Sequence, residues 1–239
     1  MACSVLQVEA AAALPPLLVF GHGMATTAGI MAGATEPSLL FVPADSTYPN
    51  GTLLAVAGAH PTNTSLGNAL VLRTSHDRGA SWGPIQMPFL PFSDPAVVGS
   101  FFQNMLTYNE RTGSVFLTIG NITRRTNTCG NGAGNLESED GLLQIASEDR
   151  GATWSTPPLN VQAQLQDSPT RCLAPTTGAG VYMNNSATPV RFRGRQLMTG
   201  VHNAYHGDVI VFSDDNGMTY RASTGLYIPG IESHGDSRI

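Results

Sequence analysis

The sequence is short of charge, of long apolar runs and of cysteine, and each shortage excludes a class of protein. Only 12% of the 239 residues are charged and the net charge is −5. No basic cluster is longer than Arg124-Arg125, so the chain lacks the electrostatic footprint of a nucleic-acid-binding protein. No apolar run reaches the roughly 18 residues of a membrane-spanning helix. An apolar content of 41% excludes a disordered chain.

Three cysteines make no disulfide framework, and their spacing matches no zinc site. Cys129 and Cys172 lie in loop-like stretches and could pair in an oxidising compartment, which would leave Cys3 over. The sequence contains no nucleophile elbow, phosphate loop or dinucleotide fingerprint. We therefore expect neither a metal nor a cofactor. The sequence assigns no cellular compartment, although glycosylation would favour a secreted or lysosomal-type one. Four tripeptides would then accept glycans: Asn50, Asn63, Asn121 and Asn184.

Helical patterning is equally scarce, and its best example, residues 5–14, runs into two prolines that would end a helix. The 26 glycines and 16 prolines instead predict many turns, as in an all-β protein with short strands. Residues 1–30 are interpreted as an N-terminal segment, either disordered or a degenerate secretory signal without a basic start.

One nine-residue pattern, Ser-x-Asp-x-Gly-x-Ser/Thr-aromatic with the residue before it, occurs three times. Each copy follows an apolar or alternating run of strand type, at residues 69–72, 142–145 and 208–212. The aspartates are 72 and then 66 residues apart, whereas a propeller blade needs about 40–50 residues. Either the copies lie one blade apart with long loops, or some blades lack the pattern.

Each copy predicts a hairpin bend. The aspartate accepts hydrogen bonds from nearby backbone N–H groups, the glycine supplies a positive φ, and the aromatic ring packs beneath the loop. We therefore interpret these acids as structural rather than catalytic. The residues predicted to build the bends are Ser75, Asp77, Gly79, Trp82, Ser147, Asp149, Gly151, Trp154, Ser213, Asp215, Gly217 and Tyr220.

The three segments resemble the Asp boxes (bacterial neuraminidase repeats) of the sialidase (neuraminidase) family. Other stretches are similar to that family at residues 51–57, 112–117, 178–181, 193–197 and 229–234. The likeness extends from about residue 36 to the C-terminus. It implies a six-bladed all-β propeller of sialidase type, truncated here to about four blades, that occupies residues 31–239.

The resemblance also implies an exo-α-sialidase, a glycoside hydrolase that releases terminal sialic acid, or a similar acidic sugar, from glycoconjugates. In such enzymes three arginines hold the substrate carboxylate, a tyrosine activated by a glutamate is the nucleophile, and an aspartate is the acid/base. Glu232 matches the functional glutamate. Thr35 stands where the first arginine belongs, and His60 stands where a further arginine is frequent.

The stretch that should hold the acid/base aspartate, residues 61–68, contains no acid. Asn63 or Asn68 could occupy the place, but an amide cannot donate a proton in this role. We therefore expect little or no sialidase activity from the chain as given. The alternative is a propeller that binds carbohydrate or protein without catalysis.

Other polar residues leave alternatives open. His202, His206 and Asp208 form the densest cluster, which could ligate a metal, contact substrate at a pocket rim, or be ordinary loop polarity. His234 and Asp236 could assist Glu232 or form a turn. Three tyrosines could be imagined as the nucleophile, although buried or rim tyrosines are commoner: Tyr182, Tyr205 and Tyr227.

Overall fold

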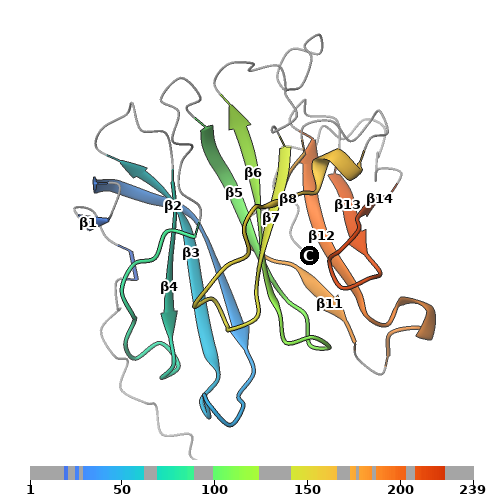
Figure 1. Cartoon of the computed structure of the whole chain (residues 1–239), viewed down its shortest axis with the longest axis horizontal. Helices are drawn as coiled ribbons and strands as arrows, with labels where there is room; N and C mark the ends of the chain where they lie inside the picture. The colour runs from blue at the N-terminus through green and yellow to red at the C-terminus, as the bar shows by residue number, and fades with distance from the viewer. Residues whose placement is uncertain are drawn as a thin grey trace, which may run out of the picture.

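In the structure, a computed structural model, the regular secondary structure of the described residues is almost entirely β-strand, arranged in three sheets (Figure 1). It describes residues 19–20, 25–26, 29–61, 69–88, 99–123, 141–165, 173–175, 178–184, 187–202 and 208–223. Within these residues no helix is long and apolar enough to cross a membrane.

The first two sheets are formed mainly by strands that follow one another in the chain. The first has the order β1-β2-β3-β4, and the second the order β10-β5-β6-β7-β8. The first sheet contains β1 (Ala25–Thr26), β2 (Gly29–Val42), β3 (Thr52–Pro61) and β4 (Ala69–Ser75). The second contains β5 (Gly99–Tyr108), β6 (Val115–Thr123), β7 (Gly141–Ser147), β8 (Leu159–Asn160) and β10 (Gly178–Ala179).

The third sheet has the order β11-β12-β13-β14, and β9 also pairs with β12. Its strands are β9 (Leu173–Pro175), β11 (Val181–Met183), β12 (Arg195–His202), β13 (Asp208–Ser213) and β14 (Arg221–Ala222). Two short 3-10 helices, η3 (Gln162–Gln164) and η4 (Val190–Phe192), lie in the connections. All strand pairs are antiparallel except β10 with β5.

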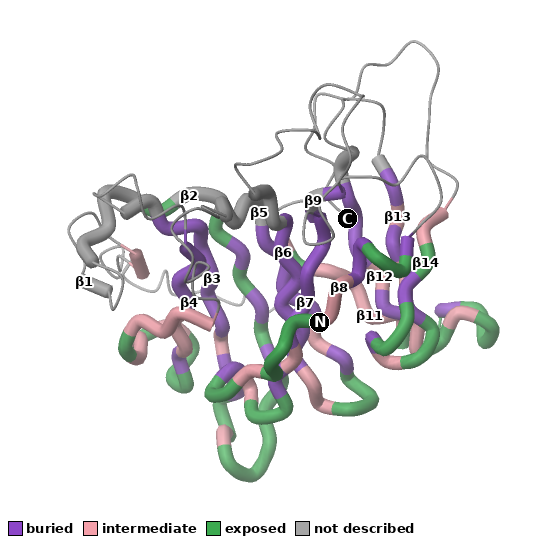
Figure 2. Tube along the Cα trace, turned by 45° about the horizontal axis from the view of Figure 1, so that its top comes forward, coloured by how far each residue is buried: buried purple, intermediate pink, exposed green. Residues whose placement is uncertain are grey.

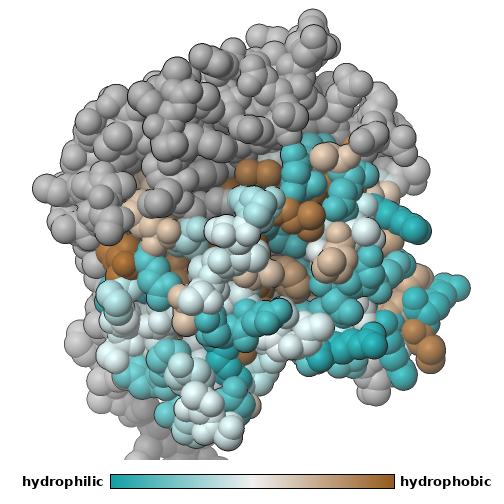
Figure 3. Space-filling model, in the orientation of Figure 1, coloured by the Kyte–Doolittle hydropathy of each residue, from teal (hydrophilic) through white to brown (hydrophobic). Residues whose placement is uncertain are grey.

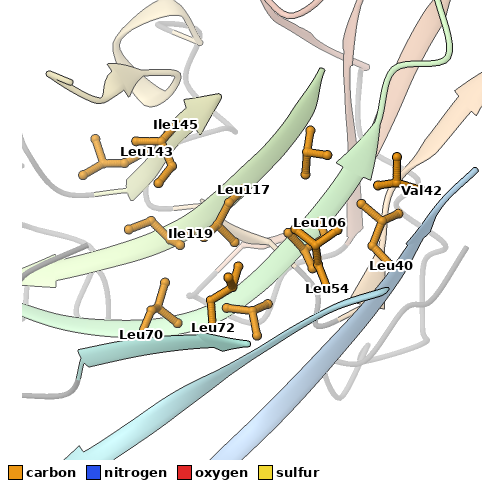
Figure 4. Close-up of a cluster of buried hydrophobic side chains, with 12 residues drawn as sticks. Leu40, Val42, Leu54, Leu70, Leu72, Leu106, Leu117, Ile119, Leu143 and Ile145 are labelled. Carbon is orange, nitrogen blue, oxygen red and sulfur yellow. The ribbon is translucent and has the colours of Figure 1, made fainter. Parts of the chain in front are cut away.

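Two apolar cores hold the sheets together, one on each side of the second sheet. The core between the first and second sheets includes Leu54, Leu70 and Leu117, all fully buried (Figure 4). The core between the second and third sheets includes Met105 and Val211. Because side chains alternate along a strand, the second sheet can contribute to both cores at once. Figure 2 shows the burial concentrated along the strands, with exposed residues in the loops.

Strands of the first and second sheets meet around Ser38 of β2. Its hydroxyl donates to the carbonyl of Asn104 in β5 (2.8 Å) and accepts from the N–H of Gly178 in β10 (2.9 Å). Gly180 permits this approach, because a Cβ there would lie 2.2 Å from the Oγ1 of Thr107. β10 of the second sheet, which leads into β11 of the third, is thereby tied to β2 of the first sheet.

The predicted strands are confirmed where the chain is described. The runs at 69–72, 142–145 and 208–212 fall within β4, β7 and β13. Each repeat lies on a different sheet, so consecutive copies are one sheet apart with long connections, the first of the two alternatives. β2 begins at Gly29, two residues before the expected start of the folded region. The helix-like stretch at 5–14 lies outside the described residues.

Candidate functional site

The sheets have two ends with different chemistry. At one end β4, β7 and β13 run into the three repeats; we name these the first turn (residues 75–82), the second turn (147–154) and the third turn (213–220). At the opposite end, the upper side of Figure 1, β3 leads to β4, β6 to β7 and β12 to β13. The candidate active-site residues of β3, β12 and β13 fall at this opposite end.

The three turns share one hydrogen-bond pattern. The serine hydroxyl donates to the aspartate Oδ1 at 2.8, 2.8 and 2.9 Å and accepts from the glycine N–H at 2.8, 2.7 and 2.9 Å. The same Oδ1 accepts from the backbone N–H four residues later at 2.8, 2.7 and 2.8 Å. Oδ2 accepts from the hydroxyl of that residue at 2.5, 2.6 and 2.5 Å. Both oxygens of each aspartate are therefore engaged in closing its turn.

These bonds favour the ionised aspartate. In the first turn, donation from the Ser81 hydroxyl and N–H lowers the pKa of Asp77 to about 2. In the second and third turns burial opposes ionisation of Asp149 and Asp215, but the hydrogen bonds outweigh burial and the pKa of each is still lowered. The glycines have φ values of 89°, 88° and 83°, which an L side chain rarely adopts.

The second and third turns each reach the preceding sheet through their fourth residue. Arg150 forms an ion pair with Asp45 (2.5 Å) and donates to the Thr52 hydroxyl (3.5 Å), both in or beside the first sheet. Asn216 accepts from the Nδ2 of Asn109, beside the second sheet (3.3 Å). Sequence reasoning missed these links, because they join residues 98–107 positions apart.

Asp45 and Asn109 play the same local part in their loops. The Oδ1 of Asp45 accepts from the N–H groups two and three residues later (2.8 and 2.7 Å), as does that of Asn109 (3.0 and 3.3 Å). An Asp or Asn that opens such a turn is a recognisable sequence feature. It could have identified both residues as loop-forming, though not as partners of the turns.

The expected arginine-clamp position lies on the innermost long strand of the first sheet. Thr35 pairs with Gly58 of β3, and a register shift follows between Thr35 and Ser38. His60, on the neighbouring strand, pairs with Gly33. The backbone thus places Thr35 and His60 on adjacent strands toward the same end of the sheet.

The two described residues of the histidine cluster lie on different strands. β12 ends at His202 and β13 begins at Asp208. Asp208 pairs with Val201, the neighbour of His202. Among the described residues no group of three His, Cys, Asp or Glu side chains could hold a metal ion.

Of the three candidate tyrosines, Tyr182 in β11 is the one that lies among the described residues. Its buried hydroxyl forms no hydrogen bond within the described part of the chain. Burial raises its pKa, partly opposed by Arg111. A nucleophilic tyrosine needs an adjacent base, and this hydroxyl has none in hydrogen-bond contact. The remaining candidates lie outside the described residues: Asn63, Asn68, Tyr205, His206, Tyr227, Glu232, His234 and Asp236.

Comparison with known proteins gives one consistent result. No protein-family profile matches the chain. A sialidase from Micromonospora viridifaciens is 26% identical over 199 residues, which are 77% of this chain and 29% of the relative. The chain therefore spans less than a third of that relative's length.

Solved sialidases share the fold at lower identity. A Hadza microbial sialidase matches with a TM-score of 0.64 and 20% identity, covering 82% of this chain and 38% of the other. The intramolecular trans-sialidase of Ruminococcus gnavus matches with a TM-score of 0.62 and 14% identity, covering 84% of this chain and 62% of the other. Trypanosoma rangeli sialidase matches with a TM-score of 0.61 and 16% identity, covering 89% of this chain and 36% of the other. The resemblance found in the sequence is confirmed: the chain is similar in sequence to a sialidase and shares the fold of solved sialidases.

Proposed function

We propose that the protein has the scaffold of a sialidase-like glycoside hydrolase and recognises terminal sialic acid, or a similar acidic sugar, on glycoconjugates. The supporting observation is the repeated unit: three successive sheets, each closed by the same Ser-Asp-Gly turn, in a chain that matches a sialidase over 199 residues. The R. gnavus and T. rangeli relatives were solved with oseltamivir carboxylate and a difluorosialic acid, both acidic ligands. The proposed fold is part of a six-bladed propeller.

The proposed binding edge is the end opposite the three turns. The strand pairings place the backbone of Thr35, His60 and Asp208 toward that end, and β12 ends there at His202. Because both oxygens of each turn aspartate are engaged, the turn end has no free carboxylate for proton transfer from these residues. Glu232 is the proposed activating glutamate, and His202, His206 and Asp208 are proposed to contact the sugar.

Catalysis is proposed to be weak or absent in the chain as given. With Thr35 in place of an arginine, a sugar carboxylate would lose a charge-assisted contact of about 1.5–3 kcal/mol. Because residues 61–68 contain no acid, the chain would also lack general acid/base catalysis, which contributes a rate factor of roughly 10²–10⁴. The same two positions favour the second candidate function, a propeller that binds carbohydrate or protein without cleaving it.

A fluorogenic α-sialoside separates the two functions. We expect no turnover above the uncatalysed rate from the wild-type chain, and no change in Glu232→Gln. Turnover by the wild type that Glu232→Gln abolishes would refute the inactive proposal and establish Glu232 in the reaction. Binding to a panel of sialylated and matched asialo glycans tests recognition separately. Equal binding to both members of each pair would refute the acidic-sugar proposal.

A further inference from the structure

The outer face of the first sheet, turned away from the second sheet, has smaller side chains than the corresponding face of the second sheet. Residues of the two sheets correspond by their distance from the turn serine, Ser75 or Ser147. In the second sheet this face packs on the first sheet and carries two apolar cross-strand pairs: Leu117 with Ile145, and Ile119 with Leu143. The corresponding pairs of the first sheet are Ala55 with Arg73, and Ala57 with Val71.

The alanines of this face are buried all the same. Ala57 is 1% and Ala59 is 3% exposed. Leu39 of β2, which pairs with Ala55 and therefore lies on the same face, is 56% exposed. The burial of the alanines thus comes from a cover that is confined to β3 and β4.

That cover is supplied by two segments of the same chain. Three half-buried side chains pack against Ala57, Ala59 and Val71: Phe20, Ile85 and Met87. Residues 85–87 follow the first turn and run beside β4, where Leu72 and Gln86 exchange backbone hydrogen bonds of 2.9 and 2.8 Å. Phe20 belongs to a separate segment that precedes β1. Alanines leave room for this cover, whereas residues as large as those of the second sheet would fill it.

Arg73 fastens the two segments to each other. Its Nη1 donates to the carbonyl oxygen of Val19 (2.8 Å), and its Nε and Nη2 donate to those of Gly83 (2.7 Å) and Trp82 (2.8 Å). A guanidinium carries five N–H groups in a rigid fork, so it can hold several carbonyls at once. The corresponding residue of the second sheet, Ile145, is 2% exposed in an apolar core. An arginine suits position 73 because backbone carbonyls, rather than apolar side chains, meet it there.

We propose that Val19 and Phe20 form a strap, which docks on the outer face of the first sheet and is locked there by Arg73. Phe20 covers the alanines, and Arg73 joins the strap to residues 82–83. Because one side chain holds both segments, release of the strap also weakens the end of the first turn. The docked strap shields the apolar face of β3 and β4 from water, and the released strap exposes it. This conformational device does not depend on sugar recognition.

Limited proteolysis of the full chain with chymotrypsin tests the strap, because the protease can cleave after Phe20 only when that residue is undocked. The product that begins at Gly21 is identified by its mass. The wild-type chain should be cleaved there at least about tenfold more slowly than a synthetic peptide of residues 15–25, since cleavage follows the population of the open form. Arg73→Met removes the three donors at a similar length and should accelerate this cleavage at least about tenfold.

Ala57→Leu tests the same strap from the other side. It leaves Arg73 in place but fills the space above β3, so it should also accelerate cleavage after Phe20. Arg221→Met, at an exposed position of β14, is the matched control and should leave the rate unchanged. Cleavage after Phe116, which is 6% exposed in the second sheet, reports global unfolding and should stay slow in every variant. Wild-type cleavage as fast as that of the peptide overturns the proposal, and so does equal protection in the wild type, Arg73→Met and Ala57→Leu.

Discussion

The second and third turns have the same backbone and the same aspartate, but they join their sheets by different chemistry. The second turn brings a charge, Arg150, to Asp45, and its Trp154 packs on the apolar core of the first two sheets. The third turn brings neutral groups: Asn216 meets Asn109, and the Tyr220 hydroxyl donates to the Oε1 of Gln144 in the second sheet (2.9 Å).

The difference shows which residues of the turn are fixed by its own geometry and which depend on the neighbouring sheet. Serine, aspartate and glycine close the loop on themselves, so their geometry is the same in all three copies. The fourth residue and the aromatic ring face another sheet, so their chemistry follows what that sheet presents. On the face shown in Figure 3 the described residues are mainly hydrophilic, with small apolar groups, and the aromatic rings of the second and third turns, Trp154 and Tyr220, pack on the cores.

Replacing the turn glycines by alanine should give the largest losses of stability, and the size of each loss should show how tightly each turn is packed. A Cβ on Gly217 would lie 2.8 Å from the Phe116 ring, so Gly217→Ala adds a clash to the strain of a φ of 83°. We expect it to lower the free energy of unfolding by about 2–4 kcal/mol. Gly79→Ala meets nothing closer than 3.5 Å and should lose about 1–2 kcal/mol, from backbone strain alone.

Gly151→Ala should lose at least as much as Gly217→Ala, because the nearest atom, at 2.5 Å, is a methyl carbon of Leu54, which is fully buried in the core. Urea unfolding of the three variants measures the order. A loss in Gly79→Ala as large as in Gly217→Ala would contradict the difference in packing between the turns.

Removing the Tyr220 hydroxyl should give an intermediate loss of stability, and it tests the neutral hydrogen bond by which the third turn differs from the second. Tyr220→Phe leaves the buried Oε1 of Gln144 without its donor and should lose about 1–3 kcal/mol. Tyr182→Phe is the matched control, since its hydroxyl makes no hydrogen bond within the described residues. It should unfold at the same denaturant concentration as the wild type, or higher. Equal losses in the two variants would show that the bond to Gln144 contributes nothing.

Breaking the ion pair between Arg150 and Asp45 should give the smallest loss of stability, and the dependence of that loss on salt should identify it as electrostatic. Arg150→Gln removes the ion pair with Asp45, whose side chain is 44% exposed. Exposed ion pairs are weak and screened, so the decrease in Tm should be small and should shrink further in 1 M NaCl, where the Debye length is about 3 Å. Asn216→Ala should show no such dependence on salt. A loss in Arg150→Gln that salt leaves unchanged would place its contribution in packing instead.

The sequence predicted the parts of the fold that depend on neighbouring residues. A strand, then serine, aspartate and glycine at fixed spacing, determines a bend locally, and the strands β4, β7 and β13 were predicted for that reason. β5 was not, because its apolar residues contribute to cores on both faces and show no simple alternation. The links from Arg150 to Asp45 and from Ser38 to Gly178 join distant segments, so they follow only from the tertiary arrangement.

For the candidate site, the resemblance alone predicted that Thr35 replaces an arginine and that residues 61–68 lack the expected acid. The structure adds that Thr35 lies on β2 just before a register shift and that His202 and Asp208 end and begin different strands.

The central claim is that an ionised aspartate closes each of the three turns, and a carboxyl ¹³C NMR titration tests it directly. The pKa values of Asp77, Asp149 and Asp215 should all lie below the ordinary 3.8, with Asp77 near 2. Since the folded pKa is the lower one, this stability is full above about pH 4 and is lost as the pH falls toward 2. A turn aspartate that titrates at or above 3.8 would contradict the account.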